Sequence, residues 1–207
     1  MHDIFFQNVL KAFIAIDPVA LIPIFAILTT DLSMSKIIRL SIMVFLITTS
    51  ILTFFLFYGN KFLNVMGIDL SSFQIVGGLF LFYISFEMVV EKRTKRKNEL
   101  AKSFINDQEL KDIAVFPLSI PLISGPSAIT LSILISKDFT FNLMSLYYYL
   151  LPLIIILLMA SLILIFSSMI INYCNETIIN IFQKLFGIIL GALSVQYIIN
   201  GLREVFL

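Results

Sequence analysis

The chain has 207 residues, of which 59% are hydrophobic and 13% are charged, and its mean hydropathy is +1.03. Soluble domains carry about 25% charged residues, so a soluble chain of this length could not hide so much apolar surface from water. The net charge of +1 gives no support for nucleic-acid binding, which needs a concentrated basic face. A single cysteine excludes an internal disulfide and a cysteine metal cluster. Composition therefore predicts that the solvent of this protein is lipid.

Six segments are long and apolar enough to cross the hydrocarbon core of a bilayer, which takes about 20 residues. They lie at about 4–29, 37–58, 71–90, 113–136, 143–171 and 185–202. The first residues lack the basic stretch and the small-residue cleavage site of a signal peptide, so the first segment is expected to remain as a span. The sequence predicts an all-α polytopic membrane protein, with six transmembrane helices in a single domain over residues 1–207.

The longest polar connector covers residues 91–112 and is too charged to enter lipid. It reads EKRTKRKNELAKSFINDQELKD and carries most of the Lys and Arg residues found between spans. Basic loops tend to stay on the cytoplasmic side. The loop is therefore expected to be cytoplasmic, with both termini outside. A binding site for lipid headgroups or for a partner is the alternative interpretation of the basic run.

The two halves of the chain share a spaced pattern at a nearly constant offset. Five residues recur 109 positions later, so that Phe73, Gln74, Gly78, Leu81 and Ser85 match Phe182, Gln183, Gly187, Leu190 and Ser194. Pro18 and Ala20 match Pro126 and Ala128 at an offset of 108. Each half holds an odd number of spans, so the second copy would enter the membrane upside down. The pattern predicts two inverted repeats, about 1–91 and 113–207, which is an architecture of secondary transporters.

Proline residues interrupt the first and the fourth span near their middles. Proline removes a backbone donor and pushes the preceding residue out of the helical region. Asp17-Pro18 reads as a helix cap followed by a first helical residue, and Ser124-Gly125-Pro126 reads as a stop and a restart. Both breaks are expected near the bilayer midplane, where irregular backbone needs cover from protein or a watery cavity. The alternative is a pair of proline kinks that only shape packing.

Two helix N-termini meeting at these breaks would present N–H groups and positive dipole ends, which suit a carboxylate. The backbone of Val19, Ala20, Ser127 and Ala128 would bind it. Asp17 would face an amine or a coupling cation, or it would serve only as a helix cap. The predicted substrate-binding residues are Asp17, Pro18, Val19, Ala20, Ser124, Gly125, Pro126, Ser127 and Ala128. Supporting or gating roles are predicted for Gln74, Ser85, Glu87, Gln183, Ser194 and Gln196.

Other polar and small residues within the spans carry more specific expectations. Lys11 is expected to extend outward to the interface, and Glu87 either to be solvated at the cytoplasmic boundary or to act in gating. Gln74 and Gln183 could donate hydrogen bonds to carbonyls that the prolines leave free. The glycines of the repeated pattern are expected at tight helix contacts rather than at a ligand: Gly77, Gly78, Gly187 and Gly191.

The sequence holds no recognised catalytic or nucleotide-binding constellation, so it predicts neither an enzyme nor a cofactor or metal. The matched breaks favour a secondary transporter that moves a small polar solute by alternating access, coupled to H⁺ or Na⁺. A channel or exporter for another small solute, or a membrane scaffold without transport, are the alternatives. The expected partners are the solute and the lipid bilayer, and an oligomer stays open.

Three stretches resemble the MarC family of bacterial inner-membrane proteins. They are I-D-P-x-x-x-x-P from Ile16 to Pro23, F-Q-I-V-G-G-L-F-L-F from Phe73 to Phe82, and P-L-S-I-P-L-I-S-G-P-S-A-I from Pro117 to Ile129. The resemblance covers nearly the whole chain. It implies six helices, a place in the cell inner membrane, and relatedness to transporters of small neutral amino acids such as glycine and alanine. Ser127 departs from the family, which often has glycine there.

Overall fold

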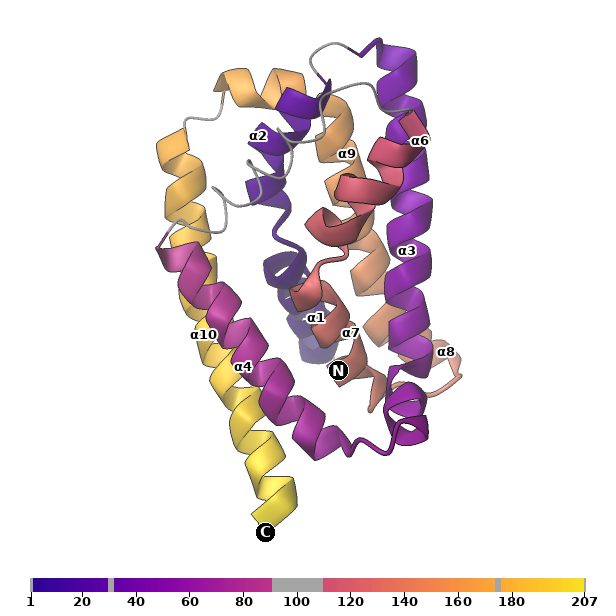
Figure 1. The fold of residues 1–207 in the computed structure, drawn as a ribbon, viewed down its shortest axis with the longest axis vertical. Coiled ribbons are helices and arrows are strands. Elements are labelled where there is room, and N and C mark those ends of the chain that lie inside the picture. The colour runs from indigo at the N-terminus through magenta and orange to yellow at the C-terminus, as the bar shows by residue number, and fades with distance from the viewer. Residues whose placement is uncertain (1, 30–31, 91–109, 174–175, 207) are drawn as a thin grey trace.

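The computed structural model describes residues 2–29, 32–90, 110–173 and 176–206, and none of these is in a strand (Figure 1). Its elements are α1 (His2–Ile16), α2 (Pro18–Thr29), α3 (Met34–Val65), α4 (Leu70–Val89), α6 (Leu110–Ile113), the π-helical η1 (Ala114–Ile123), α7 (Pro126–Ser136), α8 (Leu143–Ser145), the π-helical η2 (Leu146–Leu150), α9 (Leu151–Tyr173) and α10 (Glu176–Phe206). Most of the basic loop expected over 91–112 lies outside the described residues.

Within the described residues, five helices are long and apolar enough to cross a membrane. They are Ile4–Ala26, Met34–Val65, Leu70–Val89, Leu143–Ile170 and Thr177–Phe206. A bent pair, Leu110–Ile123 with Pro126–Ser136, supplies a sixth span if it is counted as one. The predicted all-α polytopic fold is confirmed.

Two spans are longer than the hydropathy pattern predicted. The helix α3 continues to Val65, past the polar Asn60 and Lys61, and α10 begins at Glu176 rather than near residue 185. A polar residue ends an apolar window, but it does not break the backbone hydrogen bonds of a helix. Hydropathy therefore located these spans and underestimated their lengths.

Corresponding helices of the two halves run in opposite directions in Figure 1. The pair α1 and α2 rises, α3 descends and α4 rises, whereas η1 with α7 descends, α9 rises and α10 descends. Both chain ends lie in the lower part of the view, at what we call the terminus end. The helices α4 and α10 pack against each other and stand beside the rest, while α2 packs on α9 and α7 on α3.

The protein is apolar outside and partly polar inside. Large apolar side chains are exposed along the spans, among them Leu46, Phe54, Leu158, Phe166 and Ile188. Buried hydroxyls join helices instead, because the Ser41 Oγ donates to the Ser161 carbonyl oxygen (2.8 Å) and the hydroxyls of Thr29 and Ser167 lie 3.2 Å apart. Lipid tolerates an apolar exterior, and interior polar groups must bond to protein.

The glycines predicted at helix contacts are tightly packed, as expected. A Cβ added at any of them would lie within 3.1 Å of another residue: Gly77, Gly78, Gly187 and Gly191. At Gly78 the Cβ would be 2.8 Å from the Ser194 carbonyl oxygen, and at Gly187 it would be 3.1 Å from that of Ser85. Gly78, Gly187 and Gly191 let the backbones of α4 and α10 approach closely, whereas Gly77 packs against Thr130 of α7.

Candidate functional site

The first break consists of one residue, Asp17, between α1 and α2. Its φ is +56°, a left-handed conformation that Asp tolerates better than most residues. Its amide still donates to the Phe13 carbonyl oxygen (2.9 Å), and its Oδ1 accepts a long hydrogen bond from the Ala20 amide (3.4 Å). The predicted cap is therefore present. The segment Ile4–Ala26 nevertheless remains one span.

The second break is longer and bends its span by 65°. Phe116 (φ −136°, ψ 123°) and Ile120 (φ −125°, ψ 125°) are extended, and each precedes a proline that disfavours the helical region there. The helix is therefore already interrupted at Pro117 and Pro121, before the predicted stop at Ser124. The predicted restart is confirmed, since Gly125 is the N-cap and Pro126 is the first residue of α7.

The two breaks lie against each other in the interior. The Ser127 Oγ donates a hydrogen bond to the Ala15 carbonyl oxygen at 2.7 Å, across 112 positions of sequence. Asp17 is 1% exposed and Ser127 is 2% exposed. Residues from the two halves of the chain thus form one buried junction.

The nine predicted substrate-binding residues lie in or next to the two breaks but differ in exposure. Most are buried: Asp17, Pro18, Ala20, Ser124, Gly125, Ser127 and Ala128. Val19 is partly exposed and Pro126 is exposed. The junction is therefore closed on most sides in this conformation.

Some polar groups at the second break make no hydrogen bond to the rest of the protein. The helix α7 begins without a side-chain cap. The Ser124 hydroxyl is buried, with no hydrogen-bond partner, although its amide donates to the Ser119 carbonyl oxygen (2.8 Å). Buried polar groups are usually bonded, so this hydroxyl and the start of α7 form a place where a polar ligand could be held.

The predicted supporting serines bond within their own helices. The Ser85 Oγ donates to the Phe82 carbonyl oxygen (2.7 Å), and the Ser194 Oγ donates to that of Gly191 (2.6 Å). The side chain of Gln196 is exposed and its Nε2 donates to Asn200 (3.0 Å). None of these bonds reaches the junction.

Glu87, Gln74 and Gln183 are all buried in the structure. Glu87 is only 5% exposed, so the expected solvation of its side chain at the boundary was wrong; it lies on the side of α4 that is covered by protein. Gln74 is 7% exposed and its Oε1 has no hydrogen-bond partner, while its expected donation to a carbonyl left free by the prolines stays a prediction. Gln183, its counterpart in the repeated pattern, is 1% exposed.

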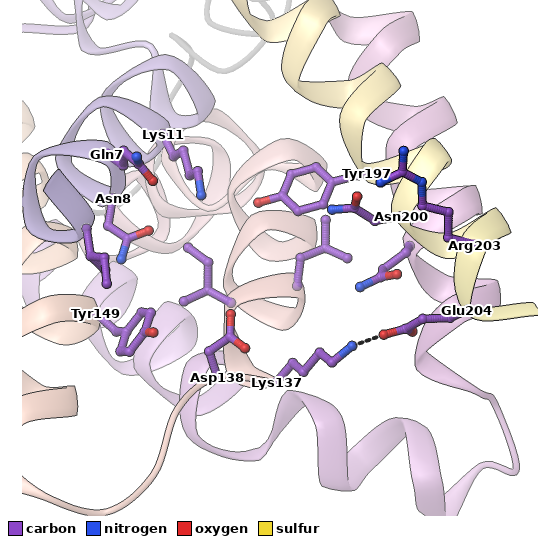
Figure 2. Close-up of a pocket in the computed structure, with 14 residues that line it drawn as sticks. Gln7, Asn8, Lys11, Lys137, Asp138, Tyr149, Tyr197, Asn200, Arg203 and Glu204 are labelled. Atoms are coloured by element: carbon purple, nitrogen blue, oxygen red, sulfur yellow. Dashed lines mark hydrogen bonds and ion pairs between the residues drawn. The ribbon is translucent and has the colours of Figure 1, made fainter. Parts of the chain in front are cut away.

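A polar cavity of about 530 Å³, the terminal cavity, opens at the terminus end (Figure 2). It is lined by Ile4, Gln7, Asn8, Lys11, Gln74, Leu134, Ile135, Lys137, Asp138, Tyr149, Tyr197, Asn200, Arg203 and Glu204. Figure 2 shows side chains converging on it from α1, α10 and the segment that follows α7. Its volume lies within the range of small-molecule sites.

The sequence did not predict the charged lining of this cavity. Lys11 points into the cavity, and its expected extension to the interface stays a prediction because the cavity opens at the terminus end (Figure 2). Asp138, Tyr149 and Tyr197 also line it, and none was a candidate. Lys11 within a span was the available signal, but its partners come from segments that only the folded chain brings near.

A cluster of buried apolar side chains joins α1, α4, α7 and α10. This cluster, here called the apolar seal, consists of Ile14, Leu81, Ile84, Met88, Leu134 and Leu190. Ile14 lies one turn beyond Lys11 and one turn before Asp17. At 1.5 Å per residue, Lys11 and Asp17 are about 9 Å apart along the helix. The cavity therefore ends short of the breaks.

A second cavity of about 470 Å³ lies beside the second break, and its lining is almost wholly apolar. Phe73, Val76 and Phe80 of α4 face Pro121, Ser124 and Pro126 across it. Val76 and Phe80 are more than half exposed, so this cavity opens on the apolar outer surface. A lipid chain suits such a lining better than a polar solute.

Comparisons with known proteins agree over nearly the whole chain. Residues 2–206 match the family described as MarC family integral membrane protein. A UPF0056 membrane protein of Methanocaldococcus jannaschii is 33% identical, over 97% of this chain and 87% of its own length. One of Archaeoglobus fulgidus is 31% identical over 97% and 92%, and YhcE of Escherichia coli is 26% identical over 98% and 94%. No solved structure matches. The chain belongs to the MarC family of integral membrane proteins.

Proposed function

We propose that this protein is a secondary transporter that moves a small zwitterionic solute, of the glycine or alanine type, by alternating access. The observation that carries the proposal is the 2.7 Å hydrogen bond from Ser127 to Ala15, which joins the breaks of two spans in the protein interior. Irregular backbone at such depth is characteristic of transporter binding sites. The proposal includes no catalytic step and no cofactor.

The chemistry of the junction suits a molecule with one positive and one negative end. The uncapped start of α7 offers a positive dipole end to a carboxylate, and the unpartnered Ser124 hydroxyl adds a donor. Asp17 supplies a negative charge at the other break. Because the junction is closely packed, only a small side chain could fit beside these groups.

The arrangement of the helices supports an alternating-access movement. The α4–α10 pair packs mainly against itself, and its glycine contacts favour motion as one body. The apolar seal joins this pair to α1 and α7. Rocking the pair away from α1 and α7 would open the seal and connect the terminal cavity with the junction.

Reciprocal contacts support the inverted repeat that such a movement needs. An added Cβ at Gly78 would meet Ser194 and Ile198, and one at Gly187 would meet Ser85 and Val89. Adding 109 to the residue numbers of the contacts at Gly187, or subtracting 109 from those at Gly78, gives the same pairs of positions in the other half of the chain. An internal two-fold relation between α4 and α10 would produce this exchange, and it would let two states of the protein mirror each other.

We infer the identity of the solute from the family resemblance. We infer an ion gradient as the driving force because the sequence contains no nucleotide-binding motif. We expect coupling to a gradient of H⁺ or Na⁺. The basic loop at 91–112 supports a cytoplasmic position for that loop. Both termini, and with them the terminal cavity, would then face outward from the inner membrane.

Uptake of labelled glycine or alanine into proteoliposomes, under an imposed H⁺ or Na⁺ gradient, tests the proposal. Wild-type protein should accumulate the label, whereas Asp17→Asn should not, because the charge that would face the amine is removed. The asparagine side chain can still cap α2, so the variant should remain folded. Ser127→Trp should also abolish uptake by wedging the breaks apart. Ser132→Ala is the matched control, because the Ser132 Oγ only donates to the Ala128 carbonyl oxygen of its own helix.

Counterflow distinguishes a carrier from a channel. A carrier loaded with unlabelled solute exchanges it for labelled solute, and a channel only equilibrates the two. Uptake that is unchanged in both Asp17→Asn and Ser127→Trp would remove the junction as the transport site.

A further inference from the structure

The terminal cavity brings charges of both signs into one space. Within the described part of its lining, the one ion pair joins Lys137 to Glu204 (Figure 2). These two charges neutralise each other at the rim. Lys11, Asp138 and Arg203 also line the cavity and take no part in that pair.

Lys11 and Asp138 face each other without closing an ion pair. Both residues line the cavity, and Figure 2 shows their charged ends directed into it from different walls. An ammonium and a carboxylate in contact would satisfy each other. Held apart across a cavity, they attract a molecule that carries the complementary charges in the opposite order.

Gln74 adds an independent sign that the cavity takes a ligand. Its side chain is 93% buried, it lines the cavity, and its Oε1 has no hydrogen-bond partner. Leaving a buried acceptor unbonded costs about 1–3 kcal/mol. An ammonium group bound in the cavity could donate to this oxygen, and the Tyr197 hydroxyl, which also lines the cavity, could donate to a carboxylate.

We propose that the terminal cavity is a second binding site, where Lys11 holds the carboxylate and Asp138 the ammonium group of a zwitterionic solute before it reaches the breaks. This inference deepens the proposed function, on which its place in transport rests. Its ligand class follows from the cavity alone. Because the cavity is wide, it should select by charge and leave selection by size to the junction.

A single tryptophan makes binding in the cavity measurable. The sequence contains no tryptophan, so Ile4→Trp, at an exposed position on the cavity rim, would be the only indole. Titrating this variant in lipid nanodiscs with glycine should change its fluorescence in a saturable way. Acetate and methylamine carry one charge each and should bind about tenfold more weakly, since each loses one of two charged contacts. Phe62→Trp, exposed and outside the cavity lining, controls for unspecific effects.

Neutralising either charge should weaken glycine binding. Lys11→Met and Asp138→Asn are each expected to raise the apparent Kd by about tenfold, the equivalent of one lost charge-assisted bond. Lys11→Arg should restore most of the affinity if charge, rather than packing, is what matters. Lys61→Met and Asp69→Asn remove the same charges from exposed positions outside the cavity and should leave Kd unchanged. Thermal unfolding of each variant verifies that it is folded.

The site and the proposed function fail separately. In the Asp17→Asn background transport should be lost while the Ile4→Trp signal with glycine persists. Transport without any saturable signal from the cavity would overturn the second site and leave the carrier standing. Equal affinity for acetate and glycine, or equal losses in Lys11→Met and Lys61→Met, would also overturn it. Binding without transport in the wild type would retain the site and refute the carrier.

Discussion

The two breaks occupy matching places in the halves of the chain but are built differently. The first is one left-handed residue, Asp17, and the span around it stays continuous. The second bends its span by 65°, and a π-helical segment with two extended residues leads into it. The first carries a charge, and the second carries hydroxyls.

The difference between the breaks determines which way round a zwitterion would bind in the junction. Two identical breaks would bind either end of a zwitterion equally well. Here Asp17 caps α2 with a negative charge, whereas α7 begins uncapped and exposes its positive dipole end. An ammonium group would therefore face the first break and a carboxylate the second. The breaks can start helices at equivalent places and still contribute opposite polarity.

The largest expected loss of stability comes from adding a side chain at the second break, which has less free space than the first. A Cβ at Gly125 would lie 2.6 Å from the Pro121 carbonyl oxygen, a backbone atom that cannot move without shifting the second break. Gly125→Ala should cost about 3 kcal/mol of unfolding free energy, at the upper end for overpacking. Pro18→Ala at the first break should cost much less, because proline there only begins α2. Thermal unfolding in detergent compares them, and equal losses would contradict the distinction.

Substitutions of Asp17 separate its structural role from its charge. Asp17→Ala loses the cap and places a residue without a compensating side chain at positive φ, which together should cost about 2 kcal/mol. Asp17→Asn keeps both properties, so its unfolding temperature should stay close to that of the wild type while uptake is lost. Active Asp17→Asn protein would show that the first break needs only a cap.

The sequence predicted where the breaks occur because proline acts locally. Asp17-Pro18 and Gly125-Pro126 start helices as expected, and the glycines of the repeated pattern pack as expected. The form of the second break was less well predicted. Pro117 and Pro121 force the residues before them into extended conformations, and that signal was present in the chain.

The terminal cavity could not be predicted, because its lining is assembled by tertiary structure. Lys11 and Asp138 are far apart in the sequence and line the same cavity only because α1 packs beside α7. Glu87 shows the same limit, because hydropathy placed it near a span end but could not tell that protein covers that side of α4. The local sequence predicts where helices span the membrane and where they break. Which side chains face each other in the folded protein depends on how the helices pack.

The bond between the breaks should have a moderate effect. Ser127→Ala removes the donor to the Ala15 carbonyl oxygen and should cost about 1 kcal/mol. Ser132→Ala removes a hydroxyl of equal size that bonds only within α7, and it should be nearly neutral. Denaturant or thermal unfolding of the two variants measures the difference. A cost as small for Ser127→Ala as for Ser132→Ala would mean that this bond does not hold the breaks together.

The smallest effect on folding should come from Ser124, and it is the sharpest test of function at the second break. Its hydroxyl is buried without a partner, so Ser124→Ala should leave stability unchanged or raise it slightly. If that hydroxyl exists to hold a solute, the same change should weaken transport, seen as a KM raised by about tenfold for one lost charge-assisted hydrogen bond. A binding site would explain why the chain keeps a hydroxyl that destabilises the empty protein but bonds to the solute. A proline kink that only shapes packing would not explain it. Unchanged KM in a fully stable Ser124→Ala protein would assign the second break to packing alone.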